Sequence, residues 1–148
     1  MVGWSCAWVA NVAARIGDGE TCYSYIADMM RLFTTSSLLD THPYPPTPEV
    51  HIFQIDGNFG VVSAVIEALC SYFDGKAHLL HAVPDNWEDG SIKGIKLPGG
   101  HTIGFSWNKG MITSGEVEIG FAKKVTLVLR DREVELVGEP GELVRFCC

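Results

Sequence analysis

Apolar residues recur every four positions at the start of the chain. This spacing places one set of side chains on a single helical face: Trp4, Trp8, Val12 and Ile16. We expect the helix to begin at Ser5, a suitable N-cap, and to end at Gly17, a residue type that commonly terminates helices. A second apolar pattern predicts a helix over residues 20–33. The loop between them is short, which favours antiparallel neighbours.

The following segment, residues 34–59, shows neither helical nor strand periodicity. It holds four of the seven prolines, Pro43, Pro45, Pro46 and Pro48. Proline fixes φ and removes a hydrogen-bond donor, so we expect an irregular loop here. Long ordered loops are often functional, and this one is rich in polar side chains: Asp40, His42, Glu49, His51, Gln54, Asp56 and Asn58. A third apolar stripe then predicts a helix over residues 59–72, with Asn58 as its N-cap.

After Gly75 the pattern changes to short runs rich in β-branched and aromatic residues, separated by turn residues. Asn108-Lys109-Gly110, between two alternating runs, is a hairpin signal. The runs predict strands at 78–83, 91–97, 101–107, 111–119, 123–129, 133–137 and 143–146. Their number and spacing are typical of an antiparallel β-sandwich. The fold class is therefore predicted to be α+β, with a helical portion at 1–75 and a β domain at 76–148.

The three predicted helices would make a poor core by themselves. A face that carries two tryptophans needs a partner, and no further helix is predicted in the chain to cover it. We therefore expect the helical portion to belong to something larger.

Composition narrows the class of protein. The 148 residues are 47% hydrophobic and 20% charged, which excludes a disordered chain. The net charge of −7 argues against a nucleic-acid partner. No apolar run of about 18 residues predicts a membrane span, and the first residues lack the pattern of a signal peptide. Five cysteines without a C-x-x-C pair predict neither a zinc site nor a disulfide framework.

The charge is also uneven along the chain. Residues 1–75 contain two basic and eight acidic residues, so this part carries −6 of the total −7. Such a field repels charged oligosaccharides and phosphates but not neutral sugars. A solvated acidic face is an equally simple interpretation of the same charges.

The segment Phe53–Gly60, with the sequence FQIDGNFG, carries the strongest chemical signal. Asp56 is expected just before a helix, where backbone N–H groups stabilise an anion. An ionised and positioned carboxylate is what a general base requires. The same residues are also suited to capping the helix, since Asp56 and Asn58 favour turns. The spacing alone leaves both interpretations open.

Several motifs together resemble the C-terminal part of glycoside hydrolase family 95, the α-L-fucosidase family. Over residues 3–115 the resemblance rests on Gly3-Trp4-Ser5 with Trp8, on Leu39-Asp40-Thr41-His42-Pro43, on Phe53–Gly60, and on His78-Leu79-Leu80 followed by Pro84, Trp87 and Gly90. Val9, His81 and the insert 44–51 depart from the family pattern, which bears on substrate specificity. The eight-residue FQIDGNFG run is the most specific of these motifs.

This resemblance implies an architecture and a reaction. The family has an (α/α)6 barrel flanked by β domains, so residues 1–75 would be the last helices of the barrel and residues 76–148 the C-terminal β domain. The family hydrolyses terminal α-1,2-linked fucose with inversion, which implies a fucosylated oligosaccharide or glycan as the partner. No cofactor, metal, nucleic acid or membrane is implied.

The resemblance also implies roles for single residues. The catalytic aspartate of the family corresponds to Asp56, which lies on the general-base side and works with two asparagines that position the attacking water. His42, Gln54 and Asn58 are implied to be substrate-binding residues near the sugar pocket. Trp4 and Trp8 are interpreted as barrel core.

An inverting hydrolase also needs a general acid about 6.5–9.5 Å from the base. Glu67 lies about nine residues into the third helix, roughly 14 Å along its axis, which is too far. Asp40 and Glu49 stay open as candidates from the sequence. In the family the acid is an upstream glutamate, and that motif does not occur here. We therefore expect a C-terminal fragment that is inactive without the missing N-terminal part of the enzyme.

Two alternatives belong to other classes. One is a non-catalytic carbohydrate-binding or interaction module in the β domain, with Trp87 and Trp107 stacking on sugar rings. The other is a metal hydrolase that uses four polar residues of the loop, Asp40, His42, His51 and Asp56. Their spacing matches no familiar metal motif, which disfavours the second alternative. The sequence does not distinguish L-fucose from L-galactose as the sugar.

Overall fold

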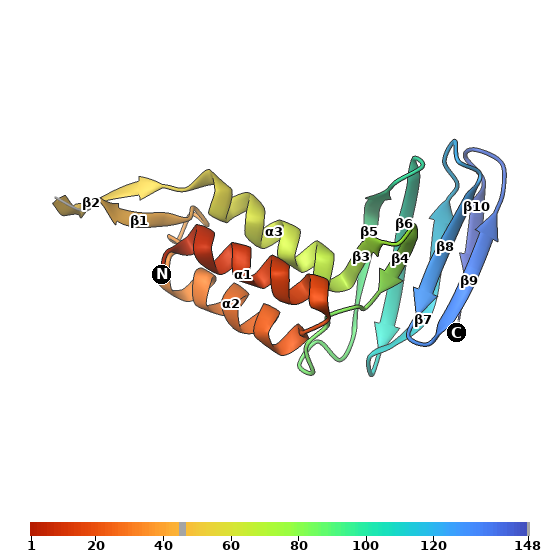
Figure 1. Cartoon of the computed structure of the whole chain (residues 1–148), viewed down its shortest axis with the longest axis horizontal. Coiled ribbons are helices and arrows are strands. Elements are labelled where there is room, and N and C mark those ends of the chain that lie inside the picture. The colour runs from red at the N-terminus through yellow and green to blue at the C-terminus, as the bar shows by residue number, and fades with distance from the viewer. Residues whose placement is uncertain (45–46, 148) are drawn as a thin grey trace.

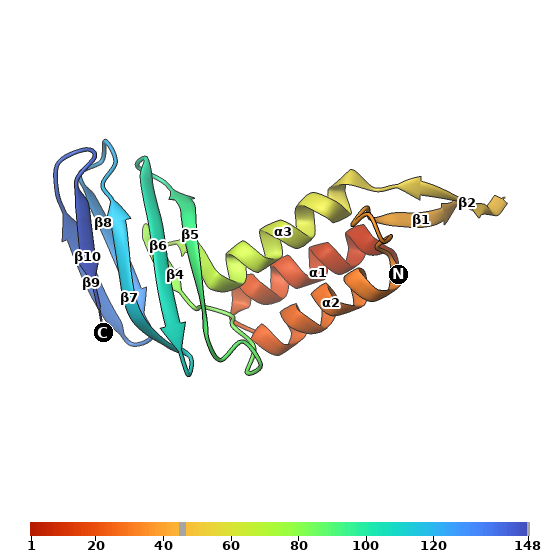
Figure 2. The same ribbon diagram turned by 180° about the vertical axis from the view of Figure 1, so that it is seen from behind.

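A computed structural model describes residues 1–44 and 47–147. It is an α+β chain in which three helices come first and a β-sandwich follows (Figure 1). Figure 2 shows the same arrangement from behind, with the helices and the sandwich lying end to end. The helices are α1 (Gly3–Ile16), α2 (Gly19–Leu32) and α3 (Ile55–Leu69). Among the described residues no helix is long and apolar enough to cross a membrane.

The turn between α1 and α2 explains why both helices stop and start where they do. Gly17 adopts a left-handed conformation with φ of 82°, which only glycine reaches without steric cost. Asp18 then caps α2, because its Oδ1 accepts a hydrogen bond from the Thr21 N–H at 3.0 Å. The prediction that Ser5 caps α1 is wrong. The helix begins at Gly3, with Val2 in the N-cap position and no side-chain cap.

The segment expected to be an irregular loop contains a β-hairpin instead. Strands β1 (Thr41–Tyr44) and β2 (Thr47–Phe53) pair in antiparallel register, with His42 opposite Ile52. A ribbon of two strands has free edges on both sides, so residues without an N–H are tolerated in it. Pro43 is accommodated next to a register shift. Pro45 and Pro46 lie outside the described residues.

Helix α3 begins earlier and ends earlier than predicted. It starts at Ile55 with Gln54 as N-cap, so Asn58 lies inside the first turn and is not the cap. It ends at Leu69 because Cys70–Phe73 forms strand β3, which pairs with β4 (Lys76–Leu79). The apolar stripe of the predicted helix therefore continues into a buried strand of the sandwich.

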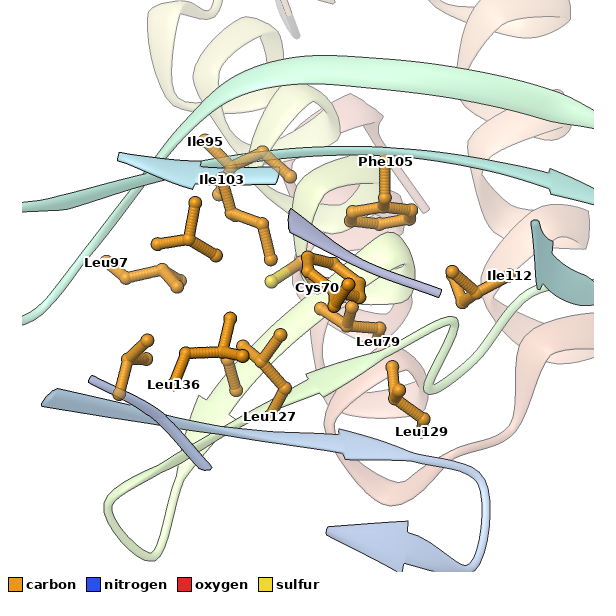
Figure 3. Close-up of a cluster of buried hydrophobic side chains, with 14 of the residues drawn as sticks. Cys70, Leu79, Ile95, Leu97, Ile103, Phe105, Ile112, Leu127, Leu129 and Leu136 are labelled. Carbon is orange, nitrogen blue, oxygen red and sulfur yellow. The ribbon is translucent and has the colours of Figure 1, made fainter. Parts of the chain in front are cut away.

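The sandwich consists of two four-stranded sheets. One has the order β3-β4-β8-β9 and the other β10-β7-β6-β5. All neighbouring strands are antiparallel except β4 and β8, which pair in parallel. Side chains from both sheets, including Leu127 and Ile103, fill the space between them (Figure 3). The remaining strands are β5 (Gly90–Leu97), β6 (His101–Asn108), β7 (Met111–Glu118), β8 (Lys124–Leu129), β9 (Arg132–Val137) and β10 (Leu143–Phe146).

The helices pack through small side chains. The buried residues of α1 are all small: Gly3, Cys6, Ala7, Ala10, Ala13 and Ala14. On α3, Gly60 lies so close to α1 that an added Cβ would come within 2.8 Å of the Ala7 side chain. This interior brings α1 and α3 close together but buries little apolar area. Large apolar side chains of both helices face outward instead.

Candidate active site

The polar residues singled out in the sequence gather where the β1–β2 hairpin joins α3. This region lies at the end of the helices remote from the sandwich (Figure 1). Helices α1 and α3 run in the same direction (Figure 1). Near their starts Gly3 and Gly57 meet the same side chain, and near their ends Arg15 pairs with Glu67. Both helices therefore present their N-terminal ends here, where the backbone is electropositive.

Asp56 lies in the first turn of α3 and its side chain is exposed. Its Oδ1 accepts a hydrogen bond from the Gly57 N–H at 3.1 Å. The first turn of a helix has free N–H groups, so it is a favourable place for an acidic side chain. Because Asp56 is exposed, a molecule that approaches from solvent can reach its carboxyl group.

Gln54 and Asn58 flank Asp56 and are tied to the preceding loop. The Gln54 N–H donates to the Asp40 carbonyl at 2.8 Å. Asn58 Oδ1 accepts from the Asp40 N–H at 2.7 Å, and Asn58 Nδ2 donates to the Leu38 carbonyl at 2.7 Å. The side-chain oxygen of Gln54 is buried and has no hydrogen-bond partner among the described residues.

His42 lies on β1 and is half-buried. Its Nδ1 is 2.7 Å from the Pro43 carbonyl. Because a carbonyl only accepts, this contact requires the proton on Nδ1 and leaves Nε2 of a neutral ring as an acceptor. His51, on the partner strand, places Nδ1 3.4 Å from the Thr41 hydroxyl.

Asp40 is completely buried, and neither of its carboxyl oxygens has a hydrogen-bond partner among the described residues. Burial raises the pKa of Asp40, and the nearby charge of Asp56 raises it further, while His42 acts in the opposite direction. A carboxyl without accessible surface cannot reach a glycosidic oxygen. This removes Asp40 as a general acid.

The other two candidate acids differ in their surroundings. Glu67 is at the opposite end of α3, where it accepts a hydrogen bond from the Ser71 hydroxyl at 2.6 Å and pairs with Arg15 at 3.1 Å. Glu49 lies exposed on β2. Within the described residues, no group of three or more His, Cys, Asp or Glu side chains is arranged to hold a metal ion.

The sequence did not reveal how much of this site depends on Asp40. The loop pattern marked it only as one polar residue among seven. Its burial follows from contacts with Gly3 and Gly57, whose positions would each place an added Cβ within the Asp40 carboxyl. No spacing in the sequence signals that these residues meet.

Two family models match the chain and together leave out only residues 70–72 and 146–148. The model of the glycosyl hydrolase family 95 catalytic domain matches residues 1–69. The model of the glycoside hydrolase family 95 C-terminal domain matches residues 73–145.

Three curated relatives also match most of the chain. Alpha-L-fucosidase 2 of Arabidopsis thaliana is 31% identical over 120 residues, which are 73% of this chain and 13% of the relative. Probable alpha-fucosidase A of Aspergillus oryzae is 29% identical over 136 residues, 85% of this chain and 19% of the relative. The protein of the same name from Aspergillus niger is 29% identical over 129 residues, 79% of this chain and 16% of the relative. The chain thus spans less than a fifth of the length of each.

Proposed function

The chain belongs to glycoside hydrolase family 95, and from this premise we propose that it supplies the base side of an active site that hydrolyses terminal α-L-fucosyl, or related α-L-galactosyl, linkages with inversion. The observation that carries the proposal is the exposed Asp56 carboxylate in the first turn of α3, within FQIDGNFG. The general acid and the two asparagines that orient the attacking water come from the part of the enzyme outside this sequence. The substrate is a fucosylated oligosaccharide or glycan.

In this proposal His42, Gln54 and Asn58 bind the sugar around Asp56. The acceptor nitrogen of His42 suits a sugar hydroxyl, which donates a hydrogen bond. Gln54 supports the proposal through its place directly before α3 and close to Asp56, because its side-chain oxygen is buried. Asn58 already makes one hydrogen bond through each end of its amide. It would reach a sugar through its second amide hydrogen or its second lone pair.

We further propose that residues 1–75 complete an (α/α)6 barrel and that residues 76–148 form its C-terminal β domain. Strand β3 then ties the helical portion into the sandwich. The support for a barrel is the outward face of α1 and α3, on which Trp8 is 65% and Phe59 69% exposed. Large apolar patches on a protein surface mark places where another element packs. A hollow of about 330 Å³ lined by Trp8, Val12 and Ile16 runs along this face.

The test is a fusion in which this chain replaces the matching C-terminal part of the Arabidopsis relative. The purified chain alone is expected to release no fucose from 2′-fucosyllactose, because it lacks the acid. The fusion is expected to release it, and Asp56→Asn should lower the rate about 10²–10⁴-fold, the contribution of one acid–base group.

The matched control is Asp131→Asn, an exposed aspartate in the turn between β8 and β9 that should leave the rate unchanged. A fusion that melts in one cooperative transition yet hydrolyses nothing would count against the proposal. Equal rates with and without Asp56→Asn would do the same.

A second candidate function is sugar binding by the β domain. It is favoured by a hollow of about 660 Å³ whose wall includes Trp87, Lys109 and Arg130. Trp107 does not contribute to such a surface, since it is 7% exposed and its Nε1 donates to the Trp87 carbonyl at 2.8 Å. Calorimetry of the whole chain with fucosylated glycans tests this candidate. Heat of binding that disappears in Trp87→Ala but persists in Asp56→Asn would support it.

A further inference from the structure

Three segments that are distant in the sequence meet at the Asp40 side chain. They are the start of α1 at Gly3, the loop that contains Asp40 itself, and the first turn of α3 at Gly57. Each segment comes from a different one of the motifs noted in the sequence. Gly57 directly follows Asp56, so the space occupied by Asp40 adjoins the proposed base.

Steric contact fixes the Asp40 carboxyl between the two helices. A Cβ added at Gly3 or at Gly57 would overlap it, so both positions need a residue without a side chain. Asp40 itself has 0% of its surface exposed. The carboxyl therefore acts as a spacer between the N-terminal ends of α1 and α3.

The main chain of Asp40 is hydrogen-bonded to the start of α3, the segment that carries Asp56. Its carbonyl accepts from the Gln54 N–H and its N–H donates to the Asn58 side chain, and these two residues bracket Asp56. Asn58 also donates a hydrogen bond to the Leu38 carbonyl, which ties α3 to the same loop a second time. Three hydrogen bonds thus join the Asp40 loop to the start of α3.

Both titratable side chains and helix ends surround the Asp40 carboxyl. The titratable groups that face Asp40 are Asp56, His42 and Cys6. The starts of two parallel helices add partial positive charge on the side of Gly3 and Gly57.

We propose that Asp40 is a positioning residue of this active site: its carboxyl sets the spacing of α1 and α3, and its main chain clamps the turn that carries Asp56. The inference rests on the proposed function of Asp56. Asp40 itself touches no sugar, because it has no accessible surface.

The experiment compares two variants of the whole chain by NMR. Asp40→Asn keeps the volume of the side chain, and Asp40→Ala removes it. The amide signals of residues 54–58 and the Asn58 side-chain NH₂ signals should stay in place in Asp40→Asn and shift in Asp40→Ala. The control is Ile26→Ala, which empties a buried position between the helices elsewhere and should lower the melting temperature without shifting those signals.

The active fusion gives the second readout. Asp40→Ala should lower kcat about 10²-fold, the cost of moving a catalytic group by about 1 Å, with KM unchanged. Asp40→Asn should keep kcat near the starting value. Signals of residues 54–58 that respond to Asp40→Ala no more than to Ile26→Ala would overturn the inference, as would a rise in KM alone.

If Asp40→Ala does not fold, two variants at glycine positions are compared instead. Gly57→Ala displaces the Asp40 carboxyl, whereas Gly60→Ala, which is also on α3, meets Ala7 of α1 and not Asp40. Only the first should shift the Asn58 side-chain signals, and equal shifts in both would overturn the inference. The NMR results do not depend on hydrolysis, so a fusion that is insensitive to Asp56→Asn would refute the proposed function alone.

Discussion

The helical part and the sandwich of this chain bury different proportions of large side chains. In the sandwich, large aliphatic and aromatic residues of both sheets close a core of their own (Figure 3). In the helical part, α1 buries only glycine, alanine and cysteine, and α2 adds Ile26 and Met29, while Trp8 and Phe59 are exposed. Burial of apolar area supplies most folding free energy. We therefore expect the sandwich to hold most of the chain's own stability, and the helices to gain more from the proposed barrel.

The largest expected effect is a cavity in the sandwich. Leu127 is fully buried between the sheets, so Leu127→Ala should lower the free energy of unfolding by about 2–5 kcal/mol. Val137→Ala, at an exposed position of the neighbouring strand β9, should change it by less than about 0.5 kcal/mol. Urea titration of both variants measures the difference. Similar losses would mean that the sandwich is not the stable part.

A smaller effect on the free energy of unfolding, which depends on pH, is expected at His78, where the helical part joins the sandwich. His78 stacks on Phe73 with ring centroids 3.7 Å apart, and burial, followed by the charge of His81, lowers the pKa of His78 below its ordinary value of 6.5. His78 therefore binds a proton less readily in the folded chain than in the unfolded chain. As a result, the free energy of unfolding falls as the pH drops below about 6.5.

The measurement is a series of melting curves between about pH 5 and about pH 7.5, a range that brackets the ordinary pKa of histidine. His78→Phe keeps a stacked ring and removes the titration, and it should flatten the dependence that His78 causes. An unchanged slope in His78→Phe would assign the pH dependence to another group.

The smallest expected effect is on the outward face of α1. Because Trp8 is exposed, Trp8→Ser should change the free energy of unfolding of the chain by less than about 0.5 kcal/mol. In the fusion the same variant should lower the melting temperature, since the proposed barrel buries this face. A large loss in the isolated chain would show that the helical part is already complete without a partner.

Periodicity in the sequence predicted the three helices and most strands of the sandwich, because apolar side chains recur on one face of each element. In the sandwich that face is buried, whereas in α1 the face with Trp8 and Val12 is exposed. The strands of the sandwich follow the alternation of apolar residues closely, as in β6 (His101–Asn108). The β1–β2 hairpin was missed because its prolines argue against a ladder. Pro43 is accommodated in β1 next to a register shift, in a two-stranded ribbon with free edges.

The candidate site was predictable only in part. FQIDGNFG marked Asp56 and its neighbours, and the start of a helix was expected close by. The role of Asn58 as a clamp and the burial of Asp40 depend on contacts between residues 17 or more positions apart, which no local pattern encodes. Glycine at positions 3 and 57 is explained only by the carboxyl that lies between them.

The parallel pairing of β4 with β8 has a consequence for how the molecule is made. It joins Ala77 to Leu127, so β4 leaves the ribosome well before the strand that must lie beside it. Contacts between distant parts of a chain form late, since their loop must first be closed at a cost in entropy. Until β8 arrives, β3 and β4 form only an isolated hairpin, and α3 has no finished sheet to rest on. Synthesis of β8 is therefore the step that allows the β3–β4 hairpin to become part of a larger sheet.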